Sequence, residues 1–183
     1  MRVIAGSARR LILKTPKGLS TRPTSDKVKE TLFNIIQGDL YGVSFLDLFA
    51  GSGGIGIEAL SRGASSCVFV DDSKEAVKCI MQNLENTGFS EKSKVISTDV
   101  LSSMGYLKDL GSFDIIFMDP PYDKGYVKKT LYEISGYGLL KDEGLIIVES
   151  LRDEDFSYLG DLGLKENRRK EYKNNMHVFL GRI

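Results

Sequence analysis

The chain has 183 residues, is 42% hydrophobic and 27% charged, and carries a formal net charge of zero. This length suffices for one domain with a sizeable core, and no apolar run approaches the roughly 20 residues that a membrane-spanning helix needs. Two cysteines and one histidine exclude a paired CxxC framework and disfavour a zinc site, so we expect no metal and a location in the reducing cytoplasm.

The first 29 residues form a basic segment. They hold eight Lys or Arg and one acid, a balance of 8 − 1 = +7, so the rest of the chain is acidic. Clustered cations neutralise phosphates, and the segment therefore predicts a polyanion-binding surface. A solvated arm is the alternative interpretation of the same charges. A second, smaller basic cluster spans 165–173.

Two short strands and a helix are predicted in the N-terminal 40 residues. The strands span 2–6 and 11–15, and apolar residues at helical spacing predict a helix over 22–37. Together they form a small basic extension, a β-hairpin and a helix over 1–40, in front of the remainder, 41–183.

From residue 43 onwards, predicted strands alternate with predicted helices. Strands are expected over 43–49, 65–71, 94–99, 111–119 and 143–150, and helices over 54–64, 73–88 and 126–135. Two final strands, joined by a polar turn at Asn174-Asn175, are predicted to form a hairpin. This alternation is typical of an α/β fold with a mostly parallel sheet covered on both faces, to which the hairpin adds an antiparallel strand.

A glycine-rich loop follows the first of these strands. Gly51, Gly53 and Gly56 have the G-x-G-x-x-G spacing of nucleotide-binding loops, and Asp71 lies at the end of the next strand. The spacing alone fits a dinucleotide such as NAD. Several nucleotide and nucleoside cofactors share it, so the flanking acids must decide between them.

Asp47, four residues before Gly51, favours S-adenosylmethionine over NAD. A carboxylate here repels a pyrophosphate but attracts the methionine ammonium of S-adenosylmethionine, which has no phosphate. We expect Asp71 to accept hydrogen bonds from the ribose hydroxyls and Asp99 to meet the adenine amino group. Two alternatives stay open: Asp47 caps the glycine turn, and Asp99 is the N-cap of the following helix.

An Asp-Pro-Pro-Tyr motif directly follows the fourth strand. An exocyclic nucleobase amine is a poor nucleophile, so it must be held in line with both N–H groups engaged. The Asp119 carboxylate and the Pro120 carbonyl accept those hydrogens, and the second proline, Pro121, helps to fix that carbonyl. The Tyr122 ring offers a stacking surface for an extruded base. The motif thus predicts amine methylation, with an ordinary proline-containing loop as the alternative.

Together with these motifs, the stretch RVIAGSARRLILKTPKGLSTRPTSDKVKETLFNII resembles the bacterial 16S rRNA guanine-N2 methyltransferases, the RsmD family. The resemblance covers nearly the whole chain. It implies one methyltransferase domain over 1–183, with a Rossmann-like class I fold and a mostly parallel seven-stranded sheet. The implied cofactor is S-adenosylmethionine. The implied substrate is 16S rRNA in the small ribosomal subunit or its assembly intermediate, methylated by a monomer that needs neither membrane nor metal.

The resemblance also implies three groups of site residues. The cofactor pocket is lined by Asp47, Phe49, Gly51, Gly53, Asp71, Asp99 and Val100. The guanine is held by Asp119, Pro120, Pro121 and Tyr122. Arg9, Arg22 and Thr24 belong to the N-terminal element at the rim of the active site and bind RNA, and the charge of the basic segment, rather than the resemblance, adds Arg10 to these RNA-binding residues. There is one departure: Arg10 stands where the family commonly has glycine, and Leu11 where a basic residue is usual, which puts the local turn and its phosphate contacts in doubt.

Three classes of function remain open. The leading one is a guanine-N2 methyltransferase, whose nearest rival is an N6-adenine or other amino methyltransferase on RNA or DNA, because both bases present an exocyclic amine. The second class is an NAD(P)-dependent oxidoreductase, which Asp47 weakens. The third is a catalytically silent RNA-binding module, whose mark would be a lost Asp119 or a broken glycine loop.

Overall fold

The computed structural model describes residues 1–16, 26–122 and 125–183. Its strands are β1 (Ser44–Leu48), β2 (Ser66–Asp71), β3 (Ser93–Ser97), β4 (Phe113–Met118), β5 (Leu140–Leu151), β6 (Leu164–Glu171) and β7 (Asn175–Arg182). Within these described parts they form one seven-stranded sheet in the order β3-β2-β1-β4-β5-β7-β6. β1 to β5 are parallel, and β7 runs antiparallel to both β5 and β6. The predicted mostly parallel sheet with a C-terminal hairpin is confirmed.

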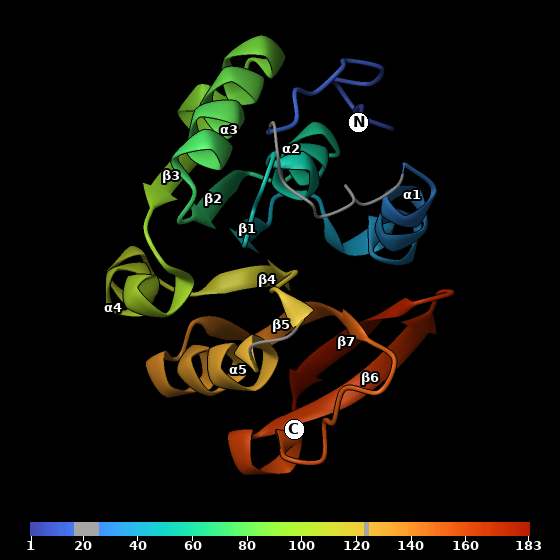
Figure 1. Ribbon diagram of the computed structural model, residues 1–183, viewed down its shortest axis with the longest axis vertical. Coiled ribbons are helices and arrows are strands. Elements are labelled where there is room, and N and C mark those ends of the chain that lie inside the picture. The colour runs from blue at the N-terminus through green and yellow to red at the C-terminus, as the bar shows by residue number, and fades with distance from the viewer. Residues whose placement is uncertain (17–25, 123–124) are drawn as a thin grey trace.

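Helices cover both faces of this sheet (Figure 1). They are α1 (Asp26–Ile35), α2 (Gly54–Ser61), α3 (Lys74–Thr87), α4 (Val100–Leu110) and α5 (Tyr126–Tyr137), with short 3₁₀ turns η1 (Gln37–Asp39), η2 (Ser90–Lys92) and η4 (Leu159–Leu162). None of the helices in the described ranges is long and apolar enough to cross a membrane.

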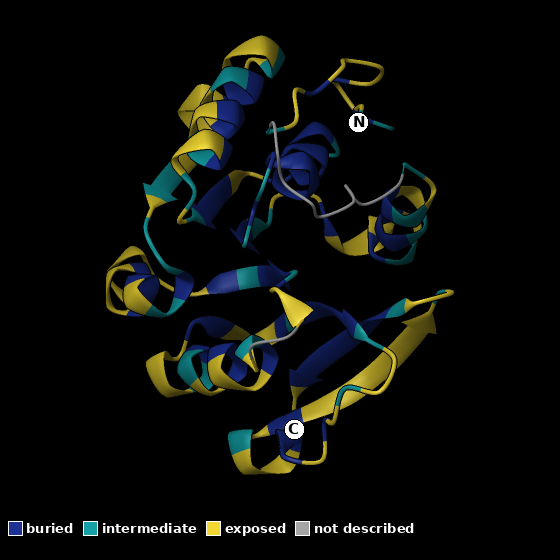
Figure 2. Cartoon of the chain, viewed as in Figure 1, coloured by how far each residue is buried: buried dark blue, intermediate teal, exposed yellow. Residues whose placement is uncertain are grey.

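Side-chain alternation along the strands separates the interior into two hydrophobic clusters. Phe45 packs with α1, α2 and α3, whereas its neighbour Leu46 packs with α4 and α5. The N-terminal residues Val3 and Leu13 belong to the first cluster, so the basic extension shares its core with the sheet. Figure 2 shows the buried central strands and the exposed edge strand β6.

The N-terminal hairpin is smaller than predicted. In place of two strands over 2–6 and 11–15, the described residues contain a single antiparallel bridge, Arg2↔Ile12. The reason is that the N–H groups of Ile4 and Ala5 donate to the Glu58 carboxylate, at 2.8 and 3.0 Å, and are not available for a strand ladder. The predicted helix is observed as α1, and its expected residues 22–25 lie outside the described residues.

Two residues in this N-terminal turn have positive φ angles. Gly6 has a φ of 84°, and a Cβ atom there would lie 1.8 Å from the Ser61 carbonyl oxygen, so only glycine fits. Arg10 has a φ of 75°, the left-handed region that costs other residues about 1 kcal/mol relative to glycine. This explains why glycine suits the position, which an exposed arginine occupies in this chain.

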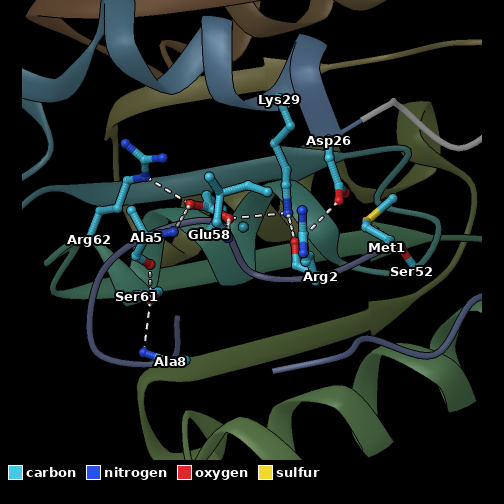
Figure 3. A network of polar contacts seen from close by, with 12 residues as sticks. Met1, Arg2, Ala5, Ala8, Asp26, Lys29, Ser52, Glu58, Ser61 and Arg62 are labelled. Carbon is cyan, nitrogen blue, oxygen red and sulfur yellow. Dashed lines mark hydrogen bonds and ion pairs between the residues drawn. The ribbon is translucent and has the colours of Figure 1, made fainter. Parts of the chain in front are cut away.

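A buried ion pair joins α1 to α2. Lys29 and Glu58 have side chains with 0% exposure, and the Lys29 Nζ atom lies 3.1 Å from Glu58 Oε2 (Figure 3). Arg62 Nε donates to Glu58 Oε1 at 2.8 Å, and the Ile4 and Ala5 amides donate to the same carboxylate. Its four donors compensate for the removal of the charge from water.

The same lysine also binds the N-terminal segment, at Arg2. Lys29 Nζ donates to the Arg2 carbonyl oxygen at 2.6 Å, and Arg2 pairs at the surface with Asp26, at the start of α1. Burial is the main cause that lowers the pKa of Lys29, and the Glu58 carboxylate opposes it. The N-terminal segment, α1 and α2 are therefore linked through one cation and one anion.

We expect Glu58→Gln to lower the free energy of unfolding by about 3–5 kcal/mol, because Lys29 then remains buried without a counter-charge. The matched control is Asp26→Asn, which removes a charge from an exposed pair and should cost less than about 1 kcal/mol. Urea denaturation of the three proteins measures both values. Equal and small losses in the two variants would show that the buried pair does not stabilise the fold.

Candidate active site

The predicted cofactor-binding and base-binding residues meet at the carboxyl edge of the sheet. β1 lies between β2 and β4, with Leu48 paired to both Val70 and Met118, so the loops after these three strands are neighbours. This is the point where the strand order reverses, the usual ligand site of a parallel sheet. The glycine loop, Asp71 and the Asp-Pro-Pro-Tyr motif are therefore brought together, as predicted.

A small cavity of about 90 Å³ lies at this edge. It is lined by Phe49, Asp71, Asp72, Asp99, Val100, Pro121 and Tyr126. Four of the seven predicted cofactor residues are in this set, and one residue of the predicted base-binding motif borders it. Asp72 and Tyr126 were not predicted, although Tyr126 could have been found as the first residue of the helix that follows the motif.

The chemistry of the lining fits a cofactor without phosphate. Three of the lining side chains are carboxylic acids and none is a Lys or Arg. Carboxylates accept hydrogen bonds from ribose hydroxyls and attract a cation, whereas they repel a pyrophosphate. Gly51 has a φ of 57°, and a Cβ atom at this position would meet nothing within 4 Å, so a ligand can approach the backbone of the turn.

Phe49 holds an unusual backbone conformation inside this pocket. Its φ of 61° is in the left-handed region, where a bulky residue is strained. The ring packs edge-on against Tyr126, with centroids 5.7 Å apart and an interplanar angle of 71°. Phe49 also lines the cavity, and its contact with the cofactor stays a prediction.

Asp71 connects β2 to the glycine loop. Its Oδ2 atom accepts the Gly51 N–H at 2.8 Å and its Oδ1 atom accepts the Ser73 N–H at 2.9 Å. Burial raises the pKa of Asp71, and these two hydrogen bonds oppose the rise. A carboxylate has further lone pairs beyond these two bonds, so its contact with a ribose stays a prediction that the geometry allows.

Asp47 has a structural role that the sequence analysis left open as an alternative. It is 1% exposed, and its Oδ2 atom accepts the Gly56 N–H at 2.9 Å in the first turn of α2. Burial is the main cause that raises the pKa of Asp47 to about 8. An acid with this pKa is largely uncharged at neutral pH, so the predicted repulsion of a pyrophosphate is better assigned to the acids that line the cavity.

Asp99 and the glycines of the loop also have roles in the local backbone structure, as helix caps and at a close helix–strand contact. Asp99 is the N-cap of α4, with its Oδ1 atom accepting the Ser102 N–H at 3.1 Å, and it also lines the cavity, so both roles considered for it are compatible. Gly53 is the left-handed N-cap of α2, with a φ of 73°. A Cβ atom on Gly56 would lie 2.3 Å from the Phe69 ring, so this glycine lets α2 pack closely on β2.

The base-binding motif leaves β4 at the rim of the cavity. Asp119 is partly buried, Pro120 is buried, and Pro121 and Tyr122 are exposed. Burial raises the pKa of Asp119 well above its usual range, and the nearby carboxylates of Glu149 and Asp47 add to the rise. Tyr122 is 41% exposed, which leaves ring surface available for stacking.

A buried polar cluster behind this motif was not predicted. Glu149 on β5 accepts hydrogen bonds from the Tyr122 hydroxyl and the Asn175 amide, and its other oxygen lies 3.1 Å from Nε2 of His177. His177 Nδ1 lies 3.2 Å from the Tyr172 hydroxyl. These residues share no spacing motif. The only indication of the cluster in the sequence was an acid, Glu149, and a histidine, His177, within segments that are otherwise largely apolar.

The predicted RNA-binding residues are partly described. A groove of about 550 Å³ separates the N-terminal turn from α1. Its lining is Arg2, Val3, Ile4, Arg9, Arg10, Asp26, Lys27 and Glu30. Arg9 and Arg10 thus line the same groove, whereas Arg22 and Thr24 lie outside the described residues, and the binding of RNA by this set stays a prediction. Within the described residues, no group of three or more His, Cys, Asp or Glu side chains is arranged to hold a metal ion.

The sheet order, the glycine loop and the acid-lined cavity define the Rossmann-like fold of the class I S-adenosylmethionine-dependent methyltransferases. Residues 1–180 match the family model described as "Conserved hypothetical protein 95", and the chain belongs to that family. This confirms the RsmD-like family expected from the sequence, and with it S-adenosylmethionine as the cofactor.

Several individual relatives are similar to the chain. A protein of Bacillus subtilis (strain 168) named "Putative rRNA methyltransferase YlbH" is 42% identical, over 88% of this chain and 89% of the relative. "Ribosomal RNA small subunit methyltransferase D" of Escherichia coli (strain K12) is 35% identical, over 82% of this chain and 74% of the relative. Among solved structures, "Putative methyltransferase yhhF from Escherichia coli" has a TM-score of 0.84 and 31% identity, covering 100% of this chain and 97% of that one.

We expect Asp47→Asn to change how stability depends on pH. The folded chain keeps the Asp47 proton up to about pH 8, whereas the unfolded chain loses it near pH 4, so this residue makes stability fall as pH rises between these values. Removing it should make the slope less negative, by at most about 1.4 kcal/mol per pH unit.

Urea denaturation at intervals between about pH 5 and 8 measures this slope. The exposed Asp109, on α4, supplies the control variant Asp109→Asn, which should keep the wild-type pH dependence. If Asp47→Asn also keeps it, then Asp47 is ionised in the folded protein and the raised pKa is wrong.

Proposed function

We propose that this chain transfers a methyl group from S-adenosylmethionine to the exocyclic N2 amine of a guanine in 16S rRNA, at position 966 in RNA numbering. One observation carries the proposal: the motif suited to holding a nucleobase amine borders the acid-lined cavity, with Pro121 in the cavity wall. The names of the relatives, which describe rRNA and small-subunit rRNA methyltransferases, support this substrate class.

The chain's own groups suit the transfer of a methyl group to an amine. S-adenosylmethionine supplies a methyl carbon that is already electrophilic. The Asp119 carboxylate and the Pro120 carbonyl accept the two N–H groups of the guanine amine, which orients its nitrogen, and Tyr122 stacks on the base. The methylated amine must lose one proton. Asp119 is the acceptor in reach, and its raised pKa makes it a stronger base than an ordinary carboxylate.

Other functions receive less support. Methylation of adenine N6 uses the same acceptors, and only the resemblance to guanine-N2 enzymes separates the two bases. An NAD(P)-dependent oxidoreductase is disfavoured by the three acids that line the cavity. A silent RNA-binding module is disfavoured because Asp119 and the glycine loop are both present. We further propose that the enzyme acts as a monomer in the cytoplasm, on the small subunit or its assembly intermediate.

The test is transfer of labelled methyl from S-adenosylmethionine to small ribosomal subunits from a strain that lacks the gene, followed by mapping of the modified nucleotide. We expect one labelled guanine, with the methyl group on N2. Label on adenine N6 would establish the rival enzyme, and an absence of label on subunits, assembly intermediates and naked rRNA would contradict the proposal.

We expect Asp119→Ala to abolish methyl transfer and to leave the affinity for S-adenosylmethionine within a few fold. Asp119→Asn should be milder, because the amide oxygen still accepts one hydrogen bond but cannot take up the proton. Single-turnover methyl transfer and calorimetric titration of the cofactor measure the two effects separately. Wild-type turnover in Asp119→Ala would show that this acid does not hold the amine.

The basic N-terminal segment, which includes Arg9 and Arg10 in the groove beside α1, is expected to dock the RNA. Extruding a guanine costs a few kcal/mol of unstacking, and stacking on Tyr122 returns only about 1–3 kcal/mol, so phosphate contacts must supply much of the rest. Replacing Arg9, Arg10 and Arg22 by Gln should raise the KM for the ribosomal substrate strongly. The slope of log affinity against log salt should fall by about 0.7–0.9 for each phosphate that the variant no longer neutralises.

Binding across a salt series compares this triple variant with the wild type. The matched control replaces Lys78, Lys92 and Lys108, three exposed lysines on α3, η2 and α4, by Gln. The control should keep the wild-type slope. If the plots of log affinity against log salt coincide for the wild type and the arginine variant, the N-terminal segment does not dock RNA. This result would favour the alternative interpretation of the segment as a solvated arm.

A further inference from the structure

Glu149 lies directly behind the proposed base-binding motif. Met118 on β4 pairs with Val148 on β5, and the next residues along these parallel strands are Asp119 and Glu149. On its other side Glu149 pairs with His177 in the antiparallel register of β5 and β7. The residue is only 4% exposed, so its hydrogen bonds must be made within the protein.

One arrangement of hydrogens accounts for every contact of the Glu149 carboxylate and for the contact between His177 and Tyr172. An ionised Glu149 is an acceptor only, so Nε2 of His177 donates to it across 3.1 Å. In a neutral imidazole Nδ1 is then an acceptor, which matches the Tyr172 hydroxyl at 3.2 Å. The Asn175 amide and the Tyr122 hydroxyl, at 3.4 Å, donate to the second oxygen of Glu149. The carboxylate is therefore held from three sides.

The position of this cluster argues that packing alone does not explain it. Two residues earlier on the same pair of strands, Ile147 faces Phe179, and both are buried and apolar. Apolar residues thus fit this strand pair, and a buried polar network costs more desolvation than they do. The polar residues occur where the strand pair reaches Asp119 and Tyr122.

We infer that Glu149 is a positioning residue of the methyl-transfer site: it fixes the Tyr122 ring through the phenol hydroxyl and places a negative charge beside Asp119, with His177 and Asn175 holding it in place. This inference rests on the proposed function, because it assigns Glu149 a part in holding the nucleobase. Glu149 is too buried to be a substrate ligand itself and acts through Tyr122 and Asp119.

The two effects have separate consequences. The hydrogen bond to Glu149 restrains the Tyr122 side chain, which is 41% exposed, so the stacking surface is already in place when a base arrives. The charge disfavours ionisation of Asp119, which raises its affinity for a proton. Asp119 is therefore a better acceptor for the proton that the amine loses.

Glu149→Gln tests the inference, since it keeps the size of the side chain and removes the charge. We expect kcat to fall about tenfold, as for the loss of a charged hydrogen-bond acceptor that orients a substrate-binding group. The KM for S-adenosylmethionine and the melting temperature should stay near the wild-type values. Tyr122→Phe should give a similar loss, and the double variant should be less impaired than the product of the two single effects.

The pH dependence of kcat/KM distinguishes a positioning role of Glu149 from a purely structural role. The kcat/KM value should rise with pH as Asp119 ionises, and removing the Glu149 charge should move this acidic limb to lower pH. Among the described residues, the titratable groups that face the pair are Asp47 on β1, Tyr122, Tyr172 and His177 on β7. His177→Gln keeps the carboxyl group of Glu149 but removes a side chain that supports it, so its acidic limb should stay closer to that of the wild type.

Asp114→Asn is the matched control. Asp114 lies at the opposite end of β4, where it binds Ser44 and Lys141, and this variant should keep the wild-type kcat and pH profile. Wild-type kcat and acidic limb in Glu149→Gln, with an inactive Asp119→Ala, would overturn the inference and leave the proposed function intact. A parallel loss of kcat, cofactor affinity and melting temperature in Glu149→Gln would also overturn it. Wild-type turnover in Asp119→Ala would instead contradict the proposed function.

Discussion

The ion pair between Lys29 and Glu58 is the interaction on which the arrangement of the site depends. A buried ion pair is stable only if further hydrogen bonds satisfy its charged groups. Here the backbone amides of Ile4 and Ala5 and the Arg62 side chain donate to the Glu58 carboxylate. Glu58 is on α2, the helix that begins at the glycine loop, and Lys29 is on α1, beside the basic groove. The pair therefore couples the cofactor side of the molecule to the proposed RNA side.

A second constraint is the presence of partly or fully buried carboxyl groups on three adjacent strands. Asp47, Asp119 and Glu149 lie on or directly after β1, β4 and β5 at the same edge of the sheet. Hydrogen-bond donors contact Asp47 and Glu149, whereas burial and the two neighbouring carboxyl groups raise the pKa of Asp119. Such an arrangement lowers stability and shifts pKa values, and it is typical of sites where chemistry takes precedence over packing. A cationic cofactor and an amine substrate are the ligands that this edge suits.

The part of the site that sequence reasoning missed consists of single residues without a motif. Glu149 and His177 are 28 positions apart, and only the antiparallel pairing of β5 with β7 brings them together. Asp47 shows a related difficulty. Its position before the glycine loop was recognised, but its charge state depends on complete burial by neighbouring elements, which no local pattern reveals.

The sequence by itself determined the alternation of strands and helices, the glycine loop and the motif that ends β4, because side-chain periodicity and backbone requirements are local properties. Tertiary structure decided which partners the polar groups found. Glu58 took the amides of Ile4 and Ala5 and so reduced the predicted hairpin to a single bridge, and burial raised the pKa of Asp119 beyond what its motif implied. Desolvation and long-range hydrogen bonds depend on what packs around a residue, which the chain specifies only once it has folded.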